Sequence, residues 1–462
     1  MPRRVNEDGL FHYLSFLTTP APDTLFEGIH KIAGGCWMRI TADGTTRTHR
    51  YWDALEAAGP LQPVNDEQVL ADKLLAELRT AVALRKVSDV PVGVFLSGGI
   101  DSSTNATLFA EEGGTVKTFA IGYDQDYGSY TNELDYARQV AGQVGAEHHE
   151  LRLSIDDLID FLPRMVELQD EPIADPVCVP VYYVSKLARD NGVIVCQVGE
   201  GADELFCGYP NWQRALRMQR LNDSFPVPAF ASRAGLGLLR LAGKDHSQPY
   251  DWLDRASRGQ PVFWGGAEGF SHRAKMAILS PRMRDRFAGR TSWEAIAPLR
   301  KRFEANAQGR GTLDWMSYLD LNFRLPELLL MRVDKMSMGV SLEGRVPFLD
   351  HEFVALAMRI PEATKIRDVR GTIADVIIDR PKQGFGVPVH EWLMQRLGTF
   401  AEDAIETFLA ETDYLDADMT RALLRRGGVT AWYLLNLALW WQRWIRPPQN
   451  ITSNTEAHLH VP

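Results

Sequence analysis

Apolar, β-branched stretches alternate with helical patterns in the middle of the chain, and this alternation constrains the fold more than any other feature. Strand-like stretches are expected at residues 90–97, 115–123, 146–153 and 193–199. Helical patterns separate them, at 102–112, at 133–144 and in two further stretches before residue 193. Strands and helices in strict alternation form a parallel sheet covered by helices on both faces. The sequence therefore predicts an α/β fold with a parallel sheet flanked by helices.

The chain after residue 214 shows mainly helical patterns. Residues 214–325 show amphipathic helical stretches broken by Pro and Gly, without clear strands, and the chain to about residue 445 looks helical too. Loops are expected within that last part at 344–352 and 380–392. We therefore expect an additional C-terminal helical region beside the sheet.

Charge and hydropathy exclude several classes of function. The 462-residue chain carries a formal net charge of -10 and has a pI near 5.6, which argues against nucleic acid as the main partner. The first residues show no sustained apolar segment of a signal peptide, and the apolar stretch at 431–445 is too short for a membrane span. We therefore expect a cytoplasmic enzyme that acts on small molecules and has neither nucleic acid nor a membrane as a partner.

Metal-binding patterns of His and Cys are weak. The four cysteines form no Cys-x-x-Cys pair and are expected to be reduced and buried: Cys36, Cys178, Cys196 and Cys207. The "EHHE" stretch at 147–150 falls within an expected strand, where neighbouring side chains point to opposite faces. We therefore interpret these histidines as structural.

A glycine-rich loop, "LSGGIDSS", follows the first expected strand. Its two glycines let the backbone approach a phosphate group, its serines add hydroxyl donors, and the helix that follows turns its positive end toward an anion. Asp101 is unusual in an anion site unless it binds Mg²⁺ that bridges to the phosphates. A tight turn without a ligand is the alternative.

A second loop, "GEGADE", follows the strand at 193–199. It offers Asp203 as a second carboxylate for Mg²⁺ and Glu200 as a base, although acidic residues also favour helix starts without any ligand. Because both loops follow strands of one parallel sheet, we expect them to face a single crevice.

Six motifs occur in a fixed order: "FLSGGIDSS", "FAIGY", "DEPIADP", "VGEGADELFCGY", "DKMSMGVSLEGRVPFLDHE" and "RPKQGFGVP". Together they resemble the synthetase domain of class B, glutamine-dependent asparagine synthetases, within the wider group of N-type ATP pyrophosphatases. The resemblance covers about residues 53–445. It implies ATP and Mg²⁺ as cofactors and activation of a carboxylate as its adenylate.

The resemblance also implies roles for individual residues, according to their positions in the motifs. Residues that would bind the nucleotide are Leu96, Ser97, Gly98, Gly99, Asp101, Ser102, Ile121, Gly199 and Lys335. Asp101 and Asp203 would hold the metal, Glu200 would deprotonate the incoming amine, and Lys382 would lie near the α-phosphate. For Lys335, a structural ion pair with Asp334 is an equal alternative.

One departure from the family concerns the amino terminus. Residue 2 is proline and no cysteine precedes Cys36, so the N-terminal cysteine nucleophile of the family is not found. We expect residues 1–52 to be a remnant of an N-terminal nucleophile amidotransferase domain and its linker, and 446–462 to be a disordered tail. The chain would then not hydrolyse glutamine.

The expected function is an ATP-dependent carbon–nitrogen ligase that transfers aspartate or a related acid to ammonia or an amine, releasing AMP and pyrophosphate. The nitrogen would come as free ammonia, as an amine, or from a separate amidotransferase subunit, and a homodimer is another expected arrangement. The alternative is a lactam or lasso-peptide macrolactam cyclase that acts through the same acyl-adenylate. A tRNA-modifying pyrophosphatase and a non-catalytic scaffold are disfavoured.

Overall fold

A parallel five-stranded sheet forms the centre of the protein. The computed structural model describes residues 3–111, 113–128, 130, 132–224, 229–244, 247–365 and 386–446. The strands follow the order β5-β4-β3-β6-β7, and every neighbouring pair is parallel: β3 (Val92–Phe95), β4 (Lys117–Tyr123), β5 (Glu147–Leu153), β6 (Val195–Gln197) and β7 (Glu343–Arg345). The predicted α/β fold with a parallel sheet is therefore confirmed.

The helices between these strands also follow the predicted order. They are α4 (Ile100–Glu111), α5 (Leu134–Gln143), α6 (Ile155–Gln169) and α7 (Cys178–Asp190). The chain moves outward from β3 to β4 and β5, and then returns to place β6 on the other side of β3. Open parallel sheets bind ligands beyond the carboxyl ends of the strands where the order reverses, and in this sheet that point lies between β3 and β6.

Alternation along β4 explains how the sheet is buried on both faces. Phe119, Ile121 and Tyr123 join one apolar core with α6 and α7, whereas Ala120 joins a second core with α4 and α5. Successive side chains of a strand point to opposite faces, so a strand buried on both sides is apolar throughout. This is the pattern that predicted the sheet.

Strand β7 lies where a loop was expected from the sequence, and that expectation was wrong. Its three residues pair with β6 in the register Val195↔Glu343 and Gln197↔Arg345. The Arg345 guanidinium also donates to the carbonyls of Arg85 (3.0 Å) and Val87 (2.8 Å). A Glu-Gly-Arg stretch has no apolar alternation, so its strand conformation comes from tertiary pairing and could not be seen in the sequence.

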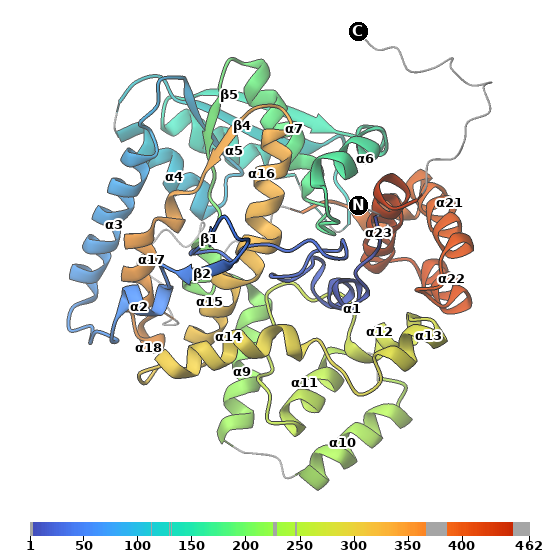
Figure 1. Cartoon of the computed structure of the whole chain (residues 1–462). Coiled ribbons are helices and arrows are strands. Elements are labelled where there is room, and N and C mark those ends of the chain that lie inside the picture. Colours follow the sequence, from blue (N-terminus) through green and yellow to red (C-terminus); the bar gives the residue numbers. More distant parts are fainter. Residues whose placement is uncertain are drawn as a thin grey trace, which may run out of the picture.

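The remaining elements are mostly helices, as predicted for the C-terminal half. Figure 1 shows α9 to α14 gathered at the far end of the molecule from β4 and β5, and α21 to α23 together at one side. In chain order they are α2 (Ala54–Ala58), α3 (Glu67–Leu84), α8 (Ala202–Phe206), α9 (Pro210–Ser224), α10 (Ala229–Leu241), α11 (Gln248–Ser257), α12 (His272–Ile278), α13 (Pro281–Arg286), α14 (Trp293–Asn306), α15 (Thr312–Asn322), the π-helical turn η1 (Leu325–Leu329), α16 (Leu330–Met338), the 3₁₀ turn η2 (Pro347–Leu349), α17 (His351–Met358), α18 (Glu362–Lys365), α20 (Val389–Leu393), α21 (Arg396–Glu411), α22 (Ala417–Arg426) and α23 (Val429–Trp444).

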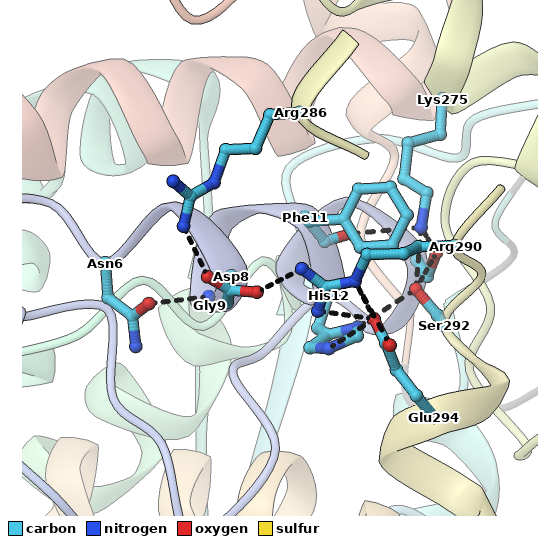
Figure 2. Close-up of polar contacts among 11 residues, drawn as sticks. Asn6, Asp8, Gly9, Phe11, His12, Lys275, Arg286, Arg290, Ser292 and Glu294 are labelled. Atoms are coloured by element: carbon cyan, nitrogen blue, oxygen red, sulfur yellow. Dashed lines mark hydrogen bonds and ion pairs between the residues drawn. The ribbon is translucent and has the colours of Figure 1, made fainter. Parts of the chain in front are cut away.

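The N-terminal helix α1 (Glu7–Phe16) is part of the core. The fully buried Lys275 of α12 donates to the Phe11 carbonyl (3.1 Å), the Ser15 hydroxyl (2.8 Å) and the Ser292 hydroxyl (2.6 Å), as Figure 2 shows in part. Its ammonium also lies 3.4 Å from the centre of the Phe11 ring. Burial lowers the pKa of Lys275 well below its usual value, against the opposing effect of nearby acids. Helix α1 is thus fixed by specific polar contacts as well as by packing.

The hairpin of β1 (Cys36–Ile40) and β2 (Thr46–Arg50) projects from this core. The two strands pair only with each other among the described residues, and most of their residues are exposed on both faces. Exposed apolar side chains include Trp37, Met38 and Ile40. No helix in the described part of the chain has the length and apolar character needed to cross a membrane.

Candidate functional site

The first predicted loop connects β3 to α4 and is held by its own serines. The Ser102 hydroxyl accepts a hydrogen bond from the Ser97 backbone N–H (3.2 Å) and lies 3.0 Å from the Ser97 hydroxyl. Gly98 has a φ of 74°, and a Cβ atom there would lie 2.6 Å from the Cβ of Tyr136. Only glycine fits this position, because the left-handed conformation and the close approach both exclude a side chain.

The second loop connects β6 to α8 and touches the first. A Cβ atom on Gly199 would lie 3.2 Å from the backbone nitrogen of Ser102, at the start of α4. Gly201 has a φ of 103°, and its Cβ would lie 2.4 Å from the Leu349 side chain. The two loops therefore meet at the edge of the sheet where the strand order reverses, and a crevice that both of them face stays a prediction.

The chemistry of these loops fits a phosphate group with a bound cation. Asp101 lies in the first turn of α4 and Asp203 in the first turn of α8, after neighbouring parallel strands. Mg²⁺ is held in nucleotide sites by one or two carboxylates together with phosphate oxygens. Among the described residues no three His, Cys, Asp or Glu side chains gather to hold a metal alone. Asp101 and Asp203 are the carboxylates of the two loops that could take part in such a site.

A narrow depression lies at the carboxyl ends of β3 and β4. Its walls are formed by Leu96, Ser97, Ala120, Ile121, Tyr130, Glu133, Leu134 and Ala137. Three of the predicted nucleotide-binding residues thus lie together, and Tyr130 and Glu133 are additional wall residues that were not predicted from the sequence. The depression has almost no room even for a water molecule, so the walls must part before an adenosine can enter.

The loop after β4 is tied to the strand end by Asn132. Its amide accepts from the Tyr123 backbone N–H (2.6 Å) and donates to the Tyr123 carbonyl (3.1 Å). The Tyr123 hydroxyl in turn donates to the Gly386 carbonyl (2.7 Å). Lys382 lies outside the described residues, and the described chain resumes at Gly386, beside the candidate site.

Glu200 lies in a buried ion-pair network. Its carboxylate is 2.5 Å from the guanidinium of Arg332 on α16, and Arg332 is also 2.6 Å from the carboxylate of Asp175 in the "DEPIADP" motif. Only 7% of the Arg332 side chain is exposed, against 21% for Glu200. Burial acts to lower the pKa of Arg332, but Asp175 and Glu200 outweigh it and raise that pKa. Arg332 was not predicted as a site residue, because nothing in the sequence places α16 against the second loop.

A second buried network supports the same loop. Arg324 is 3.4 Å from the Glu204 carboxylate and 3.5 Å from that of Asp320, and the Tyr209 hydroxyl donates to Glu204 (2.7 Å). Burial raises the pKa of Asp320 to about 7 and also raises that of Glu204, while Arg324 opposes both shifts. The Tyr209 hydrogen bond helps to hold this loop in place.

Lys335 forms an ion pair, although not with the residue considered from the sequence. Its ammonium is 2.6 Å from the carboxylate of Asp170, at the C-terminal end of α6. A role toward pyrophosphate stays a prediction.

The histidines and cysteines take structural positions in the described chain. His148 and His149 of β5 each lie beside a strand neighbour, Glu150 (3.1 Å) and Glu147 (3.0 Å) respectively. All four cysteines are free, and all but the half-buried Cys36 are buried, as expected. Burial raises the pKa of Cys207 to about 11, so its thiol stays protonated at neutral pH.

The fold and its paired loops place the protein among open parallel α/β proteins that bind ligands at the strand ends. More narrowly, the chain belongs to the asparagine synthase family, because the family model "Asparagine synthase" matches residues 73–446. This confirms the resemblance found in the sequence.

Individual relatives agree with this assignment. A Mycobacterium tuberculosis protein provisionally named asparagine synthetase [glutamine-hydrolyzing] is 34% identical over 87% of this chain and 61% of its own length. Asparagine synthetase [glutamine-hydrolyzing] 1 of Bacillus subtilis is 30% identical over 91% of this chain and 65% of its own length. The chain thus spans less than two thirds of these relatives. The solved NMN synthetase from Francisella tularensis matches 52% of this chain and 95% of its own at 15% identity, with a TM-score of 0.23, which is too low to support an argument.

Proposed function

We propose that the protein is an ATP-dependent ligase that forms an amide. A substrate carboxylate attacks the α-phosphate of ATP and releases pyrophosphate, and the acyl-adenylate then transfers its acyl group to ammonia or an amine. The second step releases AMP and the proton of the amine. The observation that carries the proposal is the contact between Gly199 and the start of α4, which joins a phosphate-type loop and an acidic loop into one site.

ATP would be held mainly by the first loop. Residues 97–99 and the N-terminal end of α4 would bind its phosphates, once the backbone N–H groups of Ser97 and Gly99 exchange their hydrogen bonds within the loop for the anion. Asp101 and Asp203 would hold Mg²⁺, which neutralises charge on the phosphates. The depression next to Ile121 would take the adenosine after its walls have parted.

Two charged residues would act on the acyl group. Glu200 would accept the proton of the amine, since a neutral amine is the nucleophile. Lys382 would stabilise the negative charge that develops on the α-phosphate. Support for Lys382 comes from the family motif and from the Tyr123 hydrogen bond that fixes the chain at Gly386.

The substrates and partners are part of the proposal. Aspartate is the first acid to test and ammonia the first nitrogen donor, because relatives of the family are named asparagine synthetases. A cytoplasmic location, a partner amidotransferase subunit or homodimer, and the division at residues 52 and 445 also stay predictions. Exposed apolar side chains on the β1–β2 hairpin support a contact with another protein there.

The test is pyrophosphate release with ATP, Mg²⁺ and aspartate, with ammonia or with glutamine as separate arms. Asp101→Ala and Lys382→Ala should each abolish release, whereas the exposed controls Asp418→Ala and Lys244→Ala should retain it. Release with ammonia but not glutamine would mean that the nitrogen must be supplied free. Release only with another acid, or with a peptide that carries its own amine, would favour the cyclase alternative. Folded wild-type protein that releases no pyrophosphate with any acid would refute the proposal.

A further inference from the structure

Arg332 is a buried cation shared between two carboxylates from distant parts of the chain. Its guanidinium is 2.5 Å from Glu200, after β6, and 2.6 Å from Asp175, at the start of α7. Asp175 is itself fixed, because its carboxylate accepts the backbone N–H of Val177 (3.0 Å). A buried guanidinium with two carboxylate partners has one defined position, so whatever it contacts is positioned too.

The π-helical turn η1 explains why Arg332 reaches this loop. Arg324 precedes the turn and contacts Glu204, and Arg332 follows it and contacts Glu200. In a regular α-helix, residues eight apart are separated by about 80° around the axis, at 3.6 residues per turn. A π turn takes up one extra residue, so eight residues cover the rotation of seven and the separation falls to about 20°. The turn therefore directs both arginines at the same acidic loop.

The charges around Glu200 do not balance locally. Arg332 supplies one positive charge to Glu200 and Asp175, which carry two negative charges when ionised. The charge of Glu200 also acts on Glu204 and Tyr209, and raises the pKa of both. Arg332 is thus the buried cation that holds the Glu200 carboxylate in place, and Asp175 helps to fix Arg332.

We propose that Arg332 is a positioning residue that holds the Glu200 carboxylate toward the amine, and that Asp175 fixes Arg332 in the place from which it does so. This inference rests on the proposed function and deepens it. Without Arg332 the Glu200 side chain is free to rotate, and a misplacement of about 1 Å costs roughly 100-fold in rate. Adenylate formation, which does not use the base, should be affected little.

The two half-reactions are measured separately in Arg332→Met, Arg332→Lys and Asp175→Asn. Aspartate-dependent ATP–pyrophosphate exchange reports the first, and amide formation at a fixed concentration of unprotonated ammonia reports the second, from about pH 5.5 to 9. In Arg332→Met we expect exchange within about threefold of wild type and amide formation reduced at least about tenfold.

Asp175→Asn should lower amide formation more than exchange, because Arg332 then keeps only one charged partner and is held less firmly. Arg332→Lys should restore part of the amide-forming rate, and it replaces Arg332→Met if that variant does not fold. A structural role would change melting temperature and both half-reactions together. Exchange and amide formation that fall together, or amide formation within about threefold of wild type in Arg332→Met protein that melts with the wild type, would overturn the inference. Wild-type protein that supports exchange with no acid would instead refute the proposed function and this inference with it.

Discussion

Asp320 is a buried acid whose protonation should control stability near neutral pH. It lies on α15 with no exposed surface, accepts the Gly266 backbone N–H (3.1 Å), and shares Arg324 with Glu204. Ionising two buried carboxyls that share one guanidinium carries a large free-energy penalty. Burial accordingly raises the pKa of Asp320 to about 7. Replacing Asp320 with Asn keeps the shape and the acceptor for Gly266 but removes the ionisation.

The sign and size of the effect follow from that pKa. Between pH 4 and 7 the folded chain holds a proton that the unfolded chain releases, so the stabilisation from this group is full below about pH 4 and is lost as the pH rises to about 7. A rise from 3.8 to about 7 corresponds to about 4 kcal/mol in total, at about 1.4 kcal/mol per unit. About 2 to 3 kcal/mol of this change falls between pH 5 and 8.

The assay is urea unfolding followed by Trp fluorescence at pH 5, 6, 7 and 8. The free energy of unfolding of Asp320→Asn, minus that of the wild type, should rise by about 2 to 3 kcal/mol from pH 5 to 8. Taking the difference cancels other titrating groups, such as Asp251, and the exposed Asp418→Asn variant should show no trend. A difference that stays constant within about 0.5 kcal/mol would show that Asp320 is ionised throughout, and the reasoning from burial would be wrong.

Three further substitutions test other parts of the structure. Gly201→Ala should lower the free energy of unfolding in urea by about 2 kcal/mol or more, because the added methyl group would lie 2.4 Å from a leucine side chain. Gly114 has a similar φ but lies in open space, so Gly114→Ala should lower this free energy less. Tyr123→Phe removes the hydrogen bond to Gly386. It should lower pyrophosphate release about tenfold and shift the melting temperature by only a few degrees. Unchanged release would show that this hydrogen bond does not order the site. Phe11→Ala should lower the free energy of unfolding by about 3 to 5 kcal/mol and make α1 sensitive to limited proteolysis. If α1 stays protected in this variant, packing of the Phe11 ring does not hold the helix in place.

The sheet and its loops could be predicted because their signals are local. Buried strands such as β4 are apolar on both faces, and Gly98 follows a strand directly, so a few consecutive residues carry the information. Strand β7 and Arg332 could not be predicted, since each depends on a partner more than 130 residues away. The same limit applies to Asp175, whose motif was recognised without its role.

The position of α1 has a consequence for how the protein is made. The Tyr13 hydroxyl donates to the carbonyl of Tyr433 (2.8 Å), so the first helix completes its contacts only with the last one. At about 5 to 20 residues per second, a ribosome needs roughly 20 to 80 seconds to synthesise the intervening 420 residues. During that time α1 lacks its contact with α23, although its contacts with α12 can already form, and apolar surface that stays uncovered in a nascent chain is what chaperones near the exit tunnel bind.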